Sequence, residues 1–184
     1  CIFQFVLLPF FHNYIYYCIV DIFSGSEANM AYSQLQKVEA NVHIKASADQ
    51  FHNVLCNRTH HIANIFPGKV QSVEIHKGEW GTEGSVISWN YLHEGKVCVA
   101  KEMVEGIDMK NNKMTFKVIE GDLLGHYKSF KFLLQVTPKE KGSVVNWVLE
   151  YEKQNDNTPD PYTLLELTVE MSKEIGAYLS QDHN

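Results

Sequence analysis

Positive charge is in short supply in this sequence of 184 residues, where 16 Lys and Arg stand against 22 Asp and Glu, for a formal net charge of −6. A protein that binds nucleic acid needs surplus cations to neutralise phosphates, so DNA or RNA is not expected as a partner. Cysteine is scarce too, and Cys1, Cys18, Cys56 and Cys98 show neither C-x-x-C spacing nor a paired framework. We expect reduced thiols in a cytoplasmic protein.

Motifs of hydrolytic and metal chemistry are missing as well. The sequence has no G-x-S-x-G, the turn that presents the nucleophile of many serine hydrolases. The adjacent His60 and His61 would point about 100° apart on a helix, whereas metal-binding pairs on a helix are three or four residues apart. Residues 30–184 contain no H-x-x-x-H. Neither a metal nor another cofactor is therefore expected.

Gly78, Gly81 and Gly84 have a spacing that superficially resembles a phosphate-binding loop. The pattern lacks the Gly-Lys-Ser/Thr ending and connects two predicted strands instead of a strand and a helix. It also carries Glu79 and Glu83, which would repel a phosphate group. We predict a structural connection between strands, not a nucleotide site.

Residues 1–29 contain no Lys or Arg and differ in composition from the rest of the chain. A secretory signal begins with positive charge, and Pro9 with the aromatic cluster at 14–17 would make a poor lipid-facing helix. We interpret 1–29 as an apolar leader outside the fold, either translated upstream sequence or a gene-model extension, with Met30 as the true start. The alternative is a signal or anchor segment without its first residues. The fold is expected in 30–184, without stable membrane insertion.

Alternating apolar residues predict a first strand at 38–44, where Val38, Ala40, Val42 and Ile44 share one face. Six more predicted strands follow, at 70–76, 85–92, 97–107, 114–120, 127–137 and 144–152. The connections between these six are short, which requires antiparallel neighbours.

Helical signals flank this run of six strands. Ser47 and Gln50 form a capping box before a short helix, and a second short helix over 59–65 ends at Pro67. A pair of prolines precedes a final helix over 161–179, in which apolar residues recur at helical spacing. One helix about 10 Å across covers a seven-stranded sheet only in part. We therefore predict an apolar cavity between helix and sheet.

Several collinear motifs resemble one known family. They are Pro67-Gly68-Lys69-Val70, Gly78-Glu79-Trp80-Gly81-Thr82-Glu83-Gly84-Ser85, Trp89-Asn90-Tyr91, Val118-Ile119-Glu120-Gly121-Asp122-Leu123-Leu124, Tyr127-Lys128-Ser129-Phe130, Glu150-Tyr151-Glu152-Lys153 and Pro159-Asp160-Pro161. The order of elements resembles the birch-pollen-allergen (Bet v I, START-like) superfamily, and the motifs resemble its major-latex-protein branch over about residues 31–180.

The resemblance implies an α+β fold of the helix-grip type. In this fold a curved, seven-stranded antiparallel sheet wraps around a long C-terminal helix, and two short helices follow the first strand. The resemblance also implies an internal cavity for steroid-, fatty-acid- or flavonoid-like molecules. A link to plant defence and stress responses and a cytoplasmic location come with it.

Alternation along the strands, matched to the inward face of the superfamily, selects most of the residues expected to line this cavity. Helical spacing along the final helix adds Leu164, Leu167 and Met171, and Tyr127 is added for its hydroxyl group. Glu102 alternates with Ala100 and Val104, which would place a carboxylate among apolar side chains, where it must be paired, hydrated or protonated. The alternative is a shifted register that leaves Glu102 at the surface. The predicted ligand-binding residues are Ile87, Trp89, Tyr91, Ala100, Glu102, Val104, Met114, Phe116, Val118, Tyr127, Phe132, Leu134, Leu164, Leu167 and Met171.

We predict an intracellular carrier of a hydrophobic small molecule, without catalytic residues, and we favour a monomer. The alternative is an enzyme of the alkaloid-forming type known in the superfamily, with Glu102 as its acid or base. A receptor of the abscisic-acid type is not favoured, because residues 92–96 and 122–125 depart from the gate and latch motifs of those receptors.

Overall fold

Seven strands form one antiparallel sheet in the described part of the chain, residues 35–181 of the computed structural model. The strands are β1 (Gln36–Ile44), β2 (Val70–Lys77), β3 (Val86–His93), β4 (Lys96–Asp108), β5 (Lys113–Gly121), β6 (Tyr127–Lys139) and β7 (Gly142–Lys153). Every predicted strand agrees with these bounds to within two residues at each end. The interpretation of residues 1–29 lies outside the described range.

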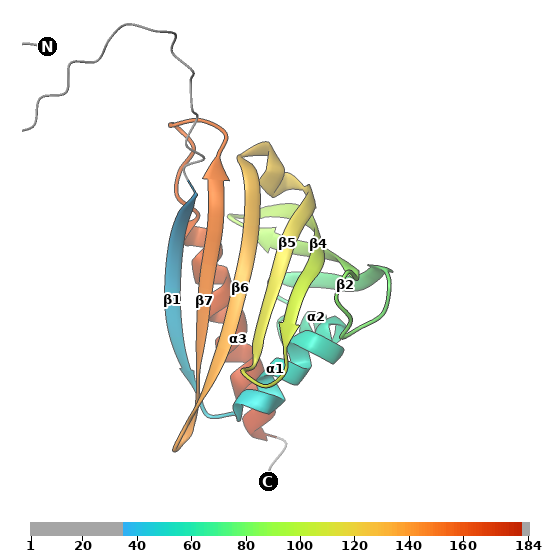
Figure 1. Cartoon of the computed structure of the whole chain (residues 1–184), viewed down its shortest axis with the longest axis vertical. Helices are drawn as coiled ribbons and strands as arrows, with labels where there is room; N and C mark the ends of the chain where they lie inside the picture. Colours follow the sequence, from blue (N-terminus) through green and yellow to red (C-terminus); the bar gives the residue numbers. More distant parts are fainter. Residues whose placement is uncertain (1–34, 182–184) are drawn as a thin grey trace, which may run out of the picture. The chain divides into compact units, whose positions relative to one another are not determined.

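The order of the strands in space is β1-β7-β6-β5-β4-β3-β2. Strands β2 to β7 form a meander, and β1 pairs with β7 at the edge opposite β2 (Figure 1). Consecutive strands β1 and β2 therefore lie at opposite edges, and the chain crosses between them through the two short helices. The expected antiparallel arrangement is confirmed.

The helical segments are α1 (Ala48–Asn57), the 3₁₀ turn η1 (Thr59–His61), α2 (Ile62–Ile65), the 3₁₀ turn η2 (Asp122–Gly125) and α3 (Tyr162–Gln181). The capping box is confirmed, because the Ser47 hydroxyl accepts the Gln50 N–H and the Gln50 side chain accepts the Ser47 N–H. The turn η2 was not predicted. It is too short for a periodic pattern and depends on a tertiary contact, in which the Asp122 carboxylate accepts the Val99 N–H at 2.7 Å.

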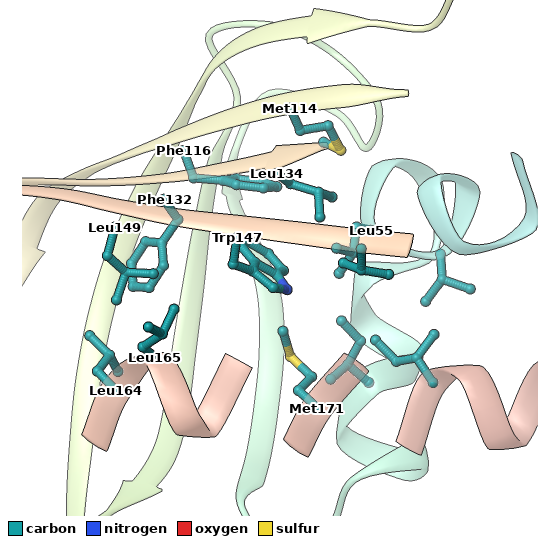
Figure 2. Packing of buried hydrophobic residues seen from close by; sticks show 14 of the residues in the cluster. Leu55, Met114, Phe116, Phe132, Leu134, Trp147, Leu149, Leu164, Leu165 and Met171 are labelled. Carbon is teal, nitrogen blue, oxygen red and sulfur yellow. The ribbon is translucent and has the colours of Figure 1, made fainter. Parts of the chain in front are cut away.

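Helix α3 packs on the concave face of the sheet. Leu164 and Met171 on α3 point toward side chains of the strands, among them Phe132 and Trp147 (Figure 2). The predicted apolar stripe is buried along most of its length, but Tyr178 is 38% exposed and Leu179 is buried in its place. No helix within residues 35–181 is long and apolar enough to cross a membrane.

Irregularities in the register help to curve the sheet around α3. One lies between Lys101 and Glu102 on β4, where the partner strand β5 advances two residues, from Glu120 to Val118. A bulge of this kind bends a strand and strengthens its twist. Another lies farther along the same strand pair, between Val104 and Gly106. The site described below lies in the resulting hollow.

Gly142 holds the β6–β7 turn against the end of β1, and its replacement tests this packing. Its φ is +92°, and a Cβ there would overlap the backbone of Ile44 and Lys45. We expect Gly142→Ala to lower the free energy of unfolding by roughly 3 kcal/mol, from strain and overpacking together. Gly95→Ala is the matched control, because φ is +76° but open space surrounds the position. It should cost only about 1 kcal/mol in urea denaturation, and equal losses would contradict the packing argument.

Candidate functional site: an apolar cavity beneath helix α3

An apolar cavity of about 70 Å³ lies between α3 and the concave face of the sheet. This volume corresponds to roughly five water-sized spheres. Six of the seven strands, α1, η2 and the residue that ends α2 contribute to its wall. The lining residues are Leu55, Phe66, Val70, Trp89, Tyr91, Ala100, Glu102, Phe116, Leu123, Phe132, Trp147, Leu164, Leu167, Thr168 and Met171.

Glu102 is the one acidic side chain of this lining, and only 8% of the residue is exposed. The alternative register, with Glu102 at the surface, is therefore wrong. Burial among apolar side chains removes water from the carboxylate and raises its pKa from 4.5 to about 8, although the nearby indole N–H of Trp89 acts in the opposite direction. Glu102 is thus protonated and uncharged at neutral pH.

Trp89 places a second polar group beside Glu102. On the paired strands, Trp89 faces Ala100 and Ile87 faces Glu102, so Trp89 and Glu102 are diagonal neighbours on the inward face. The Trp89 Nε1–H is buried and has no partner of good hydrogen-bond geometry among the described residues. It still lies near enough to Glu102 to favour the charged carboxylate. The two groups form a small polar patch in an apolar wall.

The polar groups on the opposite wall are already engaged. The Trp147 Nε1–H donates to the Ser172 hydroxyl at 2.9 Å, and that hydroxyl donates to the Thr168 carbonyl at 2.8 Å. The Thr168 hydroxyl donates to the Leu165 carbonyl at 2.7 Å. These bonds fix Trp147 against α3, and they leave β3 and β4 as the side of the cavity with unused hydrogen-bonding capacity.

Nine of the predicted ligand-binding residues lie in the lining, namely Trp89, Tyr91, Ala100, Glu102, Phe116, Phe132, Leu164, Leu167 and Met171. Six others are buried but outside it, namely Ile87, Val104, Met114, Val118, Tyr127 and Leu134. Their side chains pack within the hydrophobic core outside the cavity lining. Tyr127, for example, donates its hydroxyl to the Pro159 carbonyl at 2.9 Å. Alternation assigned the other five to the inward face but gave no position along it, and Tyr127 was predicted for its hydroxyl group.

Six lining residues were not among the predicted ones, namely Leu55, Phe66, Val70, Leu123, Trp147 and Thr168. Alternation along β7 contained a usable signal for Trp147, which lies between the buried Val145 and Leu149. Leu55 and Phe66 come from the short helices, and Leu123 comes from η2. Their approach to the cavity is set by tertiary packing, for which the sequence offers no periodic signal.

The glycine-rich segment connects β2 to β3, as predicted, and lies apart from the cavity lining. Its Glu83 carboxylate accepts the Ile107 N–H at 2.7 Å, and the Ser85 hydroxyl donates to the Glu79 carbonyl at 2.7 Å. Gly81 packs against the Asn57 side chain, where a Cβ would overlap it. Within the described range, no group of three or more His, Cys, Asp or Glu is arranged to hold a metal ion.

Comparison with known proteins identifies the family in which this architecture occurs. The model of the pathogenesis-related protein Bet v 1 family matches residues 33–182. The chain belongs to the Bet v 1 family. MLP-like protein 31 of Arabidopsis thaliana is 50% identical over 145 residues, which cover 78% of this chain and 85% of that protein.

Two further similarities place the chain in the major-latex-protein branch of the Bet v 1 family, as its motifs predicted. MLP-like protein 34 of A. thaliana is 49% identical over 146 residues, covering 78% of this chain and 46% of that protein, so the chain spans about half the length of this relative. The crystal structure of major latex-like protein 151 from Panax ginseng is 36% identical, with a TM-score of 0.76, covering 78% of this chain and 97% of that chain.

The Bet v 1 fold also occurs in a norcoclaurine synthase from Thalictrum. That structure is 18% identical, with a TM-score of 0.64 over 82% of this chain and 97% of its own. At this identity the similarity concerns the fold alone. The MLP-like relatives are not named as enzymes.

The raised pKa of Glu102 predicts how stability depends on pH. An unfolded carboxyl group loses its proton near pH 4.5, whereas the folded one keeps it to about pH 8. The native state therefore binds more protons between these values, and the Glu102 contribution to stability falls as pH rises from about 4.5 to 8. Glu102→Gln has no carboxyl group to ionise, so it does not lose stability in this way. Between about pH 4.5 and 8, its free energy of unfolding should rise by roughly 2 to 4 kcal/mol relative to that of the wild type.

Urea denaturation of both proteins at pH 5, 7 and 9 measures this difference directly, because all other titrating groups are shared. A constant difference between Glu102→Gln and wild type at the three pH values would show that Glu102 is ionised in the folded protein.

Proposed function

We propose that the chain is an intracellular carrier that holds a hydrophobic small molecule in the cavity between α3 and the sheet. The observation that carries this proposal is the cavity itself, an apolar space at the centre of the fold with one small polar patch at Trp89 and Glu102. Sites of this composition bind apolar ligands and use a few polar groups to orient them. Steroid-, fatty-acid- and flavonoid-like molecules are the proposed classes, with a role in plant defence or stress responses.

The nine predicted residues of the lining are the proposed ligand contacts. Removing apolar ligand surface from water contributes about 25 cal/mol per Å². A micromolar affinity corresponds to about −8 kcal/mol, so a few hundred Å² of buried surface suffice beyond the costs of ordering. The affinity would therefore depend more on how well the ligand's shape fits the cavity than on strong individual hydrogen bonds.

A ligand of the size of a steroid or flavonoid has to be accommodated by the side chains that line this cavity. The most adaptable part of the wall is on α3, where Met171 points at Trp147 (Figure 2). A methionine side chain has three rotatable bonds and repacks easily, and Leu167 beside it is only partly buried. We propose that these side chains give way when a ligand enters.

Catalysis is not proposed. An enzyme would need a group to exchange a proton with Glu102 or to activate the substrate. The one other side chain of the lining with a titratable proton is Tyr91, and burial raises the pKa of its phenol above the ordinary value of 10. Acid–base chemistry by Glu102 remains the alternative function, and turnover of an amine or aldehyde substrate that is lost in Glu102→Gln would support it.

Native mass spectrometry of the full chain, after exposure to a plant lipid and metabolite extract and washing, tests the carrier function. We expect a retained apolar molecule in a one-to-one complex. Ala100→Leu fills the cavity from β4 and should raise the dissociation constant for the retained molecule at least tenfold, which corresponds to about 1.4 kcal/mol. Val99→Leu, on the exposed side of the same strand, is the matched control and should bind like wild type. A folded protein without a bound molecule would overturn the proposal.

A further inference from the structure

We propose that the cavity selects ligands whose polar end is an uncharged oxygen, a hydroxyl or a carbonyl group on an apolar skeleton, and that it discriminates against carboxylates and amines. This inference rests on the proposed carrier function and narrows it to one class of ligand. It follows from the charges of the wall and from the placement of Trp89 and Glu102 in it.

The first observation is the lack of positive charge in the wall. Among the lining residues of the described chain there is no Lys, Arg or His, from any strand or helix. A ligand carboxylate would therefore be buried without a counter-cation and close to the carboxyl group of Glu102. An uncompensated buried charge is strongly unfavourable, so an anionic ligand must either stay outside or bind as its protonated form.

The second observation is the pairing of Trp89 with Glu102. The Trp89 N–H is a buried donor that lacks a partner of good geometry in the part of the chain that the structure describes, and such a group favours any ligand that supplies an acceptor. Trp147, the other indole of the lining, is already bonded to Ser172. A ligand oxygen placed at Trp89 would also meet Glu102, its diagonal neighbour on β4.

The protonation of Glu102 decides which oxygen fits. With its pKa raised to about 8 by burial, Glu102 offers an O–H donor and a carbonyl acceptor at neutral pH. A ligand carbonyl can accept from both Trp89 and Glu102, and a ligand hydroxyl can accept from Trp89 and donate to Glu102. A protonated amine supplies no acceptor for Trp89, and it requires Glu102 to ionise.

The groups that could disturb this arrangement are few. Across the lining, Tyr91 on β3 is the only other titratable side chain, and its raised pKa keeps the phenol neutral. Cys98 and Asp122 act electrostatically on Tyr91 but lie outside the lining. The lining residues of α1, β2, η2, β5, β6, β7 and α3 do not titrate. The pH dependence of ligand binding should therefore report on Glu102.

The test uses the full chain and four probes with the same alkyl chain, namely 1-dodecanol, 2-dodecanone, dodecanoate and dodecylamine. Binding is measured at pH 7 by isothermal titration calorimetry below the concentration at which each probe aggregates. We expect the alcohol and the ketone to bind with similar affinity and the carboxylate and the amine to bind at least tenfold more weakly. Tightest binding by dodecanoate or dodecylamine would overturn the inference.

Two variants test whether Trp89 and Glu102 cause the preference for an uncharged oxygen. Affinity of the wild type for 2-dodecanone should fall above about pH 8, as Glu102 loses its donor proton, whereas Glu102→Gln should bind the ketone without this decline. Trp89→Phe keeps an aromatic ring but removes the N–H, and should weaken binding of the ketone about fivefold. An unchanged pH profile in Glu102→Gln would show that another group is responsible and would overturn the assignment.

The outcomes separate the two proposals. If all four probes bind equally well, the carrier function stands and the selection for an uncharged oxygen is wrong. If none of the four binds to the folded protein, the carrier function fails and this inference fails with it.

Discussion

A single helix lying across a seven-stranded sheet is the packing constraint on which the rest of this structure depends. The concave face is wider than one helix can cover, so α3 is able to bury only part of it. Large side chains such as Met114 and Phe130 fill much of the remaining space. The space left over is the cavity. Its apolar character follows from the fold, because every strand that borders it turns its inward residues toward the same hollow.

The same constraint explains the state of Glu102. On β4 its neighbours Ala100 and Val104 are buried, and strand geometry gives the residue between them the same orientation. The carboxyl group therefore lies in a low-dielectric space without a cation. Because this environment disfavours the charged form, the group retains its proton. A buried acid of this kind weakens the fold at high pH. Its presence is explained more readily by an interaction with a ligand than by a contribution to stability.

Local patterns were sufficient to predict the strands and helices of this fold, with the exception of η2. Alternation along Val38 to Ile44 and the capping box at Ser47 are contained in a few neighbouring residues, and short connections determine which strands pair. Whether an inward-facing residue also lines the cavity depends on its position along the strand, and alternation does not give that position. Ile87 and Trp89 share one face, yet only Trp89 lines the cavity, because its position depends on α3 and η2. The hydrogen bond from Val99 to Asp122 ties η2 to β4 across 23 positions of the sequence, so no local pattern reveals it.

The strand order also has a consequence for how the chain folds. Strand β1 pairs with β7, in a register that joins Gln36 to Tyr151. The first of the described strands to leave the ribosome therefore finds its partner only when almost the whole domain has been synthesised. Contacts between residues so distant in sequence slow folding, because the intervening chain must first be ordered. Until then the inward side of β1, with Val38 and Val42, remains exposed, and an unpaired apolar strand is prone to aggregate. Synthesis of this protein in the cell is therefore expected to depend on protection of its first strand until the last one arrives.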